Sequence, residues 1–240
     1  MLYRIIFFGS FSILLYGIQL FWKSPLSPMF PYEVRNLISK GDIHYAVDLL
    51  EWRAENTWSN DVQSDSLWEA AQLVYLRLKD NERTESFVQR CLALENFTHV
   101  SEANALLASM YIDKHPKLSI QYWERAIQAT PMHVLVDDWR IRIARTHEEL
   151  GQIDMAIQSW KQIKKDSYQS EKHLALGRLQ LKEDPAEAYK HFNEVRNDAY
   201  LERAKTAELG QQLARWQLAY QQVSQTQKEM DQKRNGTKNK

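Results

Sequence analysis

Residues 143–163 read IARTHEELGQIDMAIQSWKQI, and this segment contains the clearest example of a pattern that recurs along the chain. A small residue, Ala156, is followed four positions later by a bulky one, Trp160, and Gly151 precedes both. Positions four apart lie on the same face of a helix, and glycine commonly ends one. The stretch therefore predicts two helices that turn at Gly151, with Ala156 and Trp160 in the contact between them.

The same combination of a small and a bulky residue recurs along the chain. Successive small residues are 32 to 38 positions apart, which is the length of a two-helix solenoid repeat. The small residue lets two helices cross closely, and the bulky one fills the space beside it. The five pairs are Ala46/Leu50, Thr84/Val88, Ser119/Trp123, Ala156/Trp160 and Ala188/Phe192.

Each pair is expected on the second helix of a hairpin. The polar segment 55–65 is expected to be an inserted loop, and turns are expected at Gly41, Asp80, Gly151 and Asp184. The predicted hairpins are 33–39 with 45–54, 66–78 with 84–94, 101–112 with 118–129, 136–150 with 154–164, and 171–181 with 186–195.

The fourth hairpin resembles the tetratricopeptide repeat. The matching residues are Ile143, Ala144, His147, Leu150, Gly151, Ala156, Trp160 and Ile163. The third hairpin has Leu107, Ala108, Tyr111, Ser119, Trp123, Ala126 and Pro131 at the equivalent places, whereas the fifth departs at Gln180 and the first two match less well. The resemblance covers about residues 32–197. It implies an all-α, right-handed solenoid of about five repeats that binds other proteins.

The C-terminal part predicts one long helix over residues 198–231. Its apolar stripe, spaced by three and four, is expected to cap the last repeat. A sixth repeat broken at Gly210, or a seam for a partner helix, are alternatives. Residues 232–240 are basic and expected to be disordered. The stripe consists of Leu209, Leu213, Trp216, Tyr220 and Val223.

The N-terminus predicts a membrane anchor over residues 1–23. Residues 5–22 are almost entirely apolar and would form a helix of about 27 Å, close to the thickness of a bilayer core. A cleaved signal peptide and a buried helix are the alternatives. Three prolines in residues 24–31 predict an extended spacer. We expect a single-pass protein whose larger part lies outside the cytoplasm.

Composition argues against several functions. Lys and Arg total 31, as do Asp and Glu, so no net field attracts nucleic acid. The single cysteine, Cys91, cannot form a disulfide within the chain. The histidines are scattered singly, and no metal-binding, phosphate-binding or nucleophile motif occurs. We therefore expect no enzyme activity, no cofactor, no metal and no small-molecule substrate.

The concave surface, formed in this family largely by the first helix of each hairpin, is the expected binding surface. Arginines and a lysine there form a local basic strip suited to an acidic segment or a carboxylate. Pairing with Glu148 and Glu149 is the alternative role for these cations. The candidates are Arg77, Arg142, Arg145, Arg178 and Lys182.

Together these features predict a membrane-anchored protein-interaction scaffold or assembly factor. The expected partners are other proteins, with the lipid bilayer contacted through residues 5–22. The alternative is a non-catalytic structural subunit of a larger membrane complex.

Overall fold

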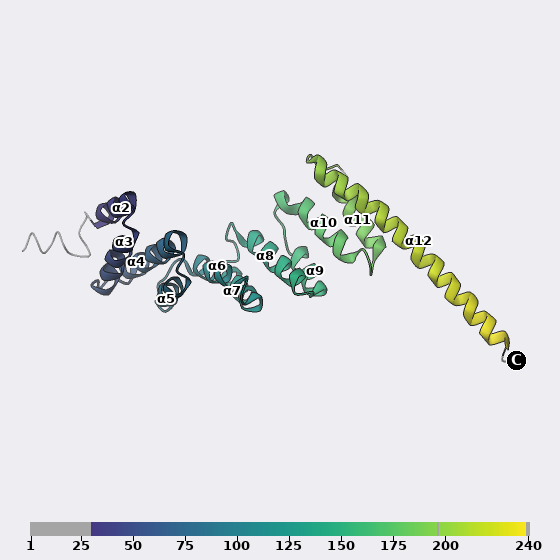
Figure 1. Cartoon of the computed structure of the whole chain (residues 1–240), viewed down its shortest axis with the longest axis horizontal. Coiled ribbons are helices and arrows are strands. Elements are labelled where there is room, and N and C mark those ends of the chain that lie inside the picture. The colour runs from purple at the N-terminus through teal and green to yellow at the C-terminus, as the bar shows by residue number, and fades with distance from the viewer. Residues whose placement is uncertain (1–29, 196, 239–240) are drawn as a thin grey trace, which may run out of the picture. The chain divides into compact units, whose positions relative to one another are not determined.

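The computed structural model describes residues 30–195 and 197–238, and every regular element in them is a helix (Figure 1). The chain divides into two compact units, the first ending at His115 and the second beginning at Pro116. In each unit, consecutive helices pack against each other. The fold expected from the repeat pattern, an all-α chain of helix hairpins, is therefore confirmed within each unit.

The first unit contains two predicted hairpins and the first helix of the third. Its elements are α2 (Phe30–Lys40), α3 (Ile43–Glu55), α4 (Asn60–Leu73), the π-helical turn η1 (Val74–Leu78), α5 (Asn81–Leu92) and α6 (Val100–Tyr111).

The second unit contains the remaining predicted helices. Its elements are α7 (Pro116–Ala129), α8 (Val136–Glu149), α9 (Ile153–Lys161), the 3₁₀ turn η2 (Asp166–Tyr168), α10 (Gln169–Gln180), α11 (Pro185–Val195) and α12 (Leu201–Lys238).

The repeated small and bulky residues are the buried contacts between helices, as predicted. Every small residue of the five pairs is 0% exposed, and every bulky partner is at most 5% exposed. Thr84, which replaces an alanine, satisfies its hydroxyl by donating to the backbone oxygen of Asp80 at 2.7 Å. A polar residue therefore fits this buried position without leaving an unpaired group.

The predicted glycine turns are also present. Gly41 and Gly151 have positive φ angles of 85° and 69°, a conformation that glycine adopts without steric cost. At the second turn, the Gly151 N–H donates to the Glu148 oxygen at 2.9 Å and the Gln152 N–H donates to the His147 oxygen at 2.8 Å. These bonds end α8 and start the chain back along α9.

The predicted loop over residues 55–65 is wrong for most of its length. Helix α4 begins at Asn60, where the Ser59 side chain caps it by accepting the Val62 N–H at 3.4 Å. The polar side chains inside are satisfied locally, because Ser66 Oγ donates to the Val62 oxygen at 2.7 Å and Ser64 Oγ to the Asp61 oxygen at 2.9 Å. Polarity alone therefore misidentified a helix start as a loop.

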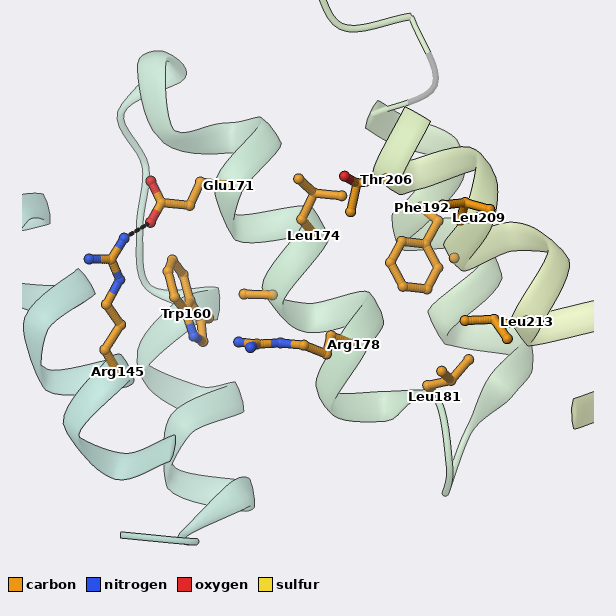
Figure 2. Close-up of a pocket in the computed structure, with 12 residues that line it drawn as sticks. Arg145, Trp160, Glu171, Leu174, Arg178, Leu181, Phe192, Thr206, Leu209 and Leu213 are labelled. Carbon is orange, nitrogen blue, oxygen red and sulfur yellow. Dashed lines mark hydrogen bonds and ion pairs between the residues drawn. The ribbon is translucent and has the colours of Figure 1, made fainter. Parts of the chain in front are cut away.

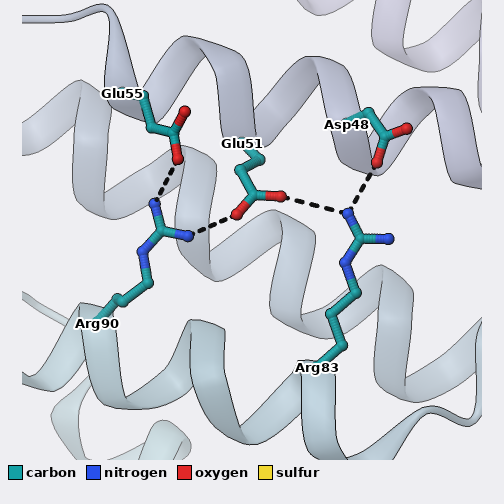
Figure 3. Close-up of polar contacts among 5 residues, drawn as sticks. All are labelled: Asp48, Glu51, Glu55, Arg83 and Arg90. Atoms are coloured by element: carbon teal, nitrogen blue, oxygen red, sulfur yellow. Dashed lines mark hydrogen bonds and ion pairs between the residues drawn. The ribbon is translucent and has the colours of Figure 1, made fainter.

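A ladder of ion pairs joins α3 and α5 on the surface of the first unit (Figure 3). Arg83 contacts Asp48 at 2.8 Å and Glu51 at 3.3 Å, and Arg90 contacts Glu51 at 2.6 Å and Glu55 at 3.3 Å. The hydrogen bond to Asp48 is the main reason that the pKa of Arg83 is raised. Single surface pairs contribute little, but this linked set fixes the register of two helices about 35 residues apart.

Helix α12 docks through its small residues, which differs from the sequence prediction. Ala207, Gly210 and Ala214 are buried, whereas the apolar stripe from Leu209 to Val223 is 54–65% exposed. The helix is continuous through Gly210, so the alternative of a sixth repeat broken there is wrong. It also extends to Lys238 and so includes residues 232–238, which were expected to be disordered.

The Phe192 ring explains why small residues face the core. A Cβ added at Gly210 would lie 2.5 Å from the ring, and one added at Gly177 would lie 2.8 Å from it. The ring of α11 therefore occupies space between α10 and α12 that only two glycines leave open. With this space filled, the bulky side chains of α12 cannot point inward.

We expect Gly210→Ala to destabilise the second unit by about 1–3 kcal/mol through overpacking. The same change in an exposed helix interior would stabilise it by about 1 kcal/mol, because alanine is the better helix former. Urea denaturation measures the sign, with the exposed Gln212→Ala as the control expected to change little. A stabilised Gly210→Ala variant would contradict the close contact with Phe192.

The predicted anchor, residues 5–22, lies outside the described residues. The spacer was expected to reach residue 31, but α2 already begins at Phe30, which is buried. Pro31 is compatible with this start, because proline fits the first turn of a helix. Within residues 30–195 and 197–238, no helix has both the length and the apolarity that crossing a bilayer requires.

Candidate functional site

The second unit has a groove of about 560 Å³ lined mainly by α10 and α12, with contributions from α8, α9 and α11 (Figure 2). Leucines form much of its lining, and the Phe192 ring lies between the two helices. An apolar groove with few polar groups is the usual form of a surface that binds an apolar segment. The leucines are Leu174, Leu181, Leu209 and Leu213.

Helical spacing brings these side chains together. Leu174 and Arg178 are four residues apart on α10, and Leu181, the residue that directly follows the helix, continues the spacing by three, so the three side chains share one face. Leu209 and Leu213 are four apart on α12, on the face that does not dock. The groove therefore exists because α12 packs through its glycine and alanines and leaves its leucines beside those of α10.

Arg145 of α8 lies at the groove and pairs with Glu171 of α10 at 2.6 Å (Figure 2). The arginine side chain is 61% exposed and the glutamate 29% exposed. The guanidinium keeps further N–H groups directed at solvent, since only one of its nitrogens takes part in this contact. The pair joins two consecutive first helices at the groove edge.

Arg178 of α10 lies at the same groove and pairs with Glu148 of α8. Glu148 also accepts a hydrogen bond of 2.6 Å from Trp160 Nε1. The carboxylate is 15% exposed, so it connects the buried indole to an exposed guanidinium. Both groove arginines are thus matched by glutamates, and the groove has an apolar surface with a charge-balanced edge.

The structure brings together two of the five predicted cations. Arg145 and Arg178 line one groove, whereas Arg142 lies with its guanidinium 5.5 Å from the centre of the Trp123 ring. Lys182 is exposed at the end of α10, where its backbone oxygen accepts from Gln221 Nε2 at 3.3 Å. Arg77 lies on η1 in the first unit. The basic strip itself stays a prediction.

The groove leucines were missed by reasoning from sequence. Helix α10 has leucines at 174, 176 and 179, which point in several directions, so it carries more leucine than one buried face requires. Leu176 is buried, whereas Leu174 and Leu179 are partly exposed. This excess could have indicated a second apolar surface. The stripe of α12 was identified but was expected to cap the last repeat.

Other titratable groups of the unit lie outside the groove. His173 and His191 approach each other with 3.0 Å between their Nδ1 atoms, so at least one ring must be neutral. Burial lowers the pKa of both rings. Among the described residues, no group of three or more histidine, cysteine or acidic side chains is arranged to hold a metal ion.

The chain matches no protein-family model, and no curated protein sequence matches it. Among solved structures, it is similar to the crystal structure of MamA, with 14% identity, a TM-score of 0.48, and coverage of 79% of this chain and 96% of that one. It is also similar to the crystal structure of PilW, a widely conserved type IV pilus biogenesis factor, with 17% identity, a TM-score of 0.46, and coverage of 81% and 91%.

Proposed function

We propose that the chain is a membrane-anchored protein-interaction scaffold or assembly factor, built as a right-handed tetratricopeptide-like solenoid. The groove between α10 and α12 binds an apolar segment of a partner protein. The observation that carries this proposal is the combination of exposed leucines with arginines already paired to glutamates.

The occupant best suited to this groove is an amphipathic helix. A helix presents apolar side chains at intervals of three and four residues, which matches the spacing of the leucines on α10 and α12. Each leucine-sized side chain that becomes buried contributes about 1.5–3 kcal/mol. Since glutamates already neutralise Arg145 and Arg178, these arginines attract acidic segments only weakly. Their role is to orient polar groups at the edge of the bound helix.

The apolar run of residues 5–22 supports attachment to a membrane. With the anchor in the bilayer, the partner is expected among membrane proteins or proteins at the membrane surface. The larger part of the chain is placed outside the cytoplasm in this proposal, since N-terminal anchors commonly deliver the following domain in that way.

The test is recovery of partners with the full chain from alkaline-washed membranes in mild detergent. Leu209→Asp should reduce recovery at least 10-fold, because a carboxylate cannot enter an apolar groove without losing its hydration. Met132→Asp, at a residue 94% exposed and outside the groove lining, is the matched control and should have no effect.

The proposal fails if the alkaline wash removes the chain, or if Leu209→Asp recovers the same partners as the unchanged chain. A complex of fixed stoichiometry that resists salt and ignores Leu209→Asp would instead favour the structural-subunit alternative. Thermal unfolding of each variant is the control for whether the second unit remains folded.

A further inference from the structure

Helix α12 continues beyond the part that packs on its own unit. Gln221 Nε2 donates to the backbone oxygen of Lys182, in the turn after α10, at 3.3 Å, and Figure 1 shows the helix extending well past α10 and α11. Isolated helices gain little stability in water without packing of an apolar face. We therefore expect a partner to pack against the apolar face of this projecting part.

That surface has the spacing of a coiled coil. Trp216, Tyr220, Val223, Gln227 and Met230, here named the distal seam, are separated alternately by four and three residues. This average of 3.5 residues favours pairing with a second helix over packing in a globular core. The four apolar members are 58–65% exposed. The seam is therefore free along the whole of its length.

The residues that flank most of the distal seam are uncharged, so they do not repel an identical helix. Gln217, Ala219, Ser224 and Thr226 flank the seam from Trp216 to Gln227, and none is charged. Asp231, which follows Met230, is a charged residue at the next flanking position. Flanking charges normally decide which helices pair, since like charges repel. Because the positions that flank Trp216 to Gln227 are neutral, a second copy of the same helix meets no charge repulsion along that part of the seam.

We propose that a second copy of this chain covers the distal seam, forming a parallel two-stranded coiled coil with it. Parallel pairing places Gln227 opposite the same residue of the second copy, where the two amides can hydrogen-bond each other. A polar residue at one core position fixes register at a cost in stability. The remaining layers bring together identical apolar side chains.

The available area indicates a weak dimer. Trp216 and Tyr220 are more than half exposed, and aromatic side chains bury about 150–250 Å² each. With Val223 and Met230 added, the seam offers roughly 400 Å² of apolar surface per copy. Together with the flanking residues, two copies would bury about 800–1,200 Å² in total, which is at the lower limit for specific interfaces. Dimerisation should therefore depend on concentration.

Dimerisation and partner binding use different residues of α12. The groove uses Leu209 and Leu213, whereas the distal seam begins at Trp216. Leu209→Asp should therefore reduce partner recovery and leave self-association unchanged. Failure of one proposal does not imply failure of the other.

Analytical ultracentrifugation of the full chain in detergent tests the pairing. The unchanged chain should shift from monomer to dimer with increasing concentration, and Val223→Glu should weaken this association at least 10-fold. The control is Gln225→Glu, which adds the same charge outside the seam and should dimerise normally. A monomer at every concentration, or a Val223→Glu variant that dimerises normally, would overturn the proposal.

Cysteine crosslinking tests the parallel register. Gln227→Cys should form a disulfide-linked dimer under mild oxidation, whereas Gln225→Cys should not. Cys91 does not interfere, because it is buried and burial raises the pKa of its thiol to about 12. A Gln227→Cys variant that dimerises without forming the disulfide would overturn parallel pairing. A monomeric chain whose distal seam binds a different protein would overturn the proposal that a second copy covers the seam.

Discussion

Trp160→Ala is expected to lower the free energy of unfolding of the second unit by about 3–5 kcal/mol. The indole is 2% exposed and packs in a cluster with Ile141, Ala144 and Leu176. Alanine would leave a cavity and would also remove the donor that Trp160 Nε1 supplies to Glu148. Two contributions, lost packing and a lost hydrogen bond, therefore add at one residue.

Denaturation followed by circular dichroism measures this loss. Trp58→Ala is the matched control, because the Trp58 side chain is fully exposed and its removal should change stability by less than about 0.5 kcal/mol. A loss below about 1 kcal/mol for Trp160→Ala would contradict its role as the buried contact of the repeat.

Asp137→Ala is expected to cost about 2–4 kcal/mol, the second large effect. The carboxylate of α8 accepts the backbone N–H groups of Lys164 and Lys165 at 2.9 and 2.7 Å, and it pairs with Arg140 at 2.8 Å. It is 9% exposed. Alanine would leave these three donors without their acceptor, so the segment after α9 would lose its attachment to α8.

The pH dependence of this effect follows from the pKa of Asp137. Burial by itself raises the pKa of Asp137, but Arg140 and the two backbone N–H groups lower it by more than burial raises it. The net shift of the pKa is therefore downward. A lowered pKa stabilises the folded state above the unfolded value of about 3.9, and this stabilisation disappears as pH falls below that value. The difference in free energy of unfolding between the unchanged chain and Asp137→Asn should have its full value at pH 7 and should decrease below about pH 4. A difference that does not change with pH would contradict the assignment.

The parts of the fold that the sequence predicted are those controlled by local spacing. Ala156 and Trp160 are four apart, and the same spacing elsewhere located the other four small and bulky pairs, all of which are buried. The glycine turns followed from backbone conformation, which also depends only on nearby residues. Both features depend on residues that are close to one another in the sequence.

The groove could not be predicted because periodicity identifies a face but not what covers it. Leu209 and Leu213 have the spacing of a core stripe, yet the Phe192 ring and the close contact at Gly210 turn the opposite face of α12 inward. The pairing of Arg145 with Glu171 likewise depends on the approach of α8 and α10, between which α9 lies in the sequence. Such contacts depend on tertiary packing, which the sequence pattern does not specify.

Photo-crosslinking in native membranes tests the central claim, that the groove of α10 and α12 binds a partner protein. A photoreactive residue is introduced at Leu181, which lines the groove, or at Met132, which lies outside it. We expect a crosslink to one defined protein from Leu181, its loss when Leu209→Asp is added, and no such crosslink from Met132. The same products from both sites, or a Leu181 crosslink that survives Leu209→Asp, would contradict it.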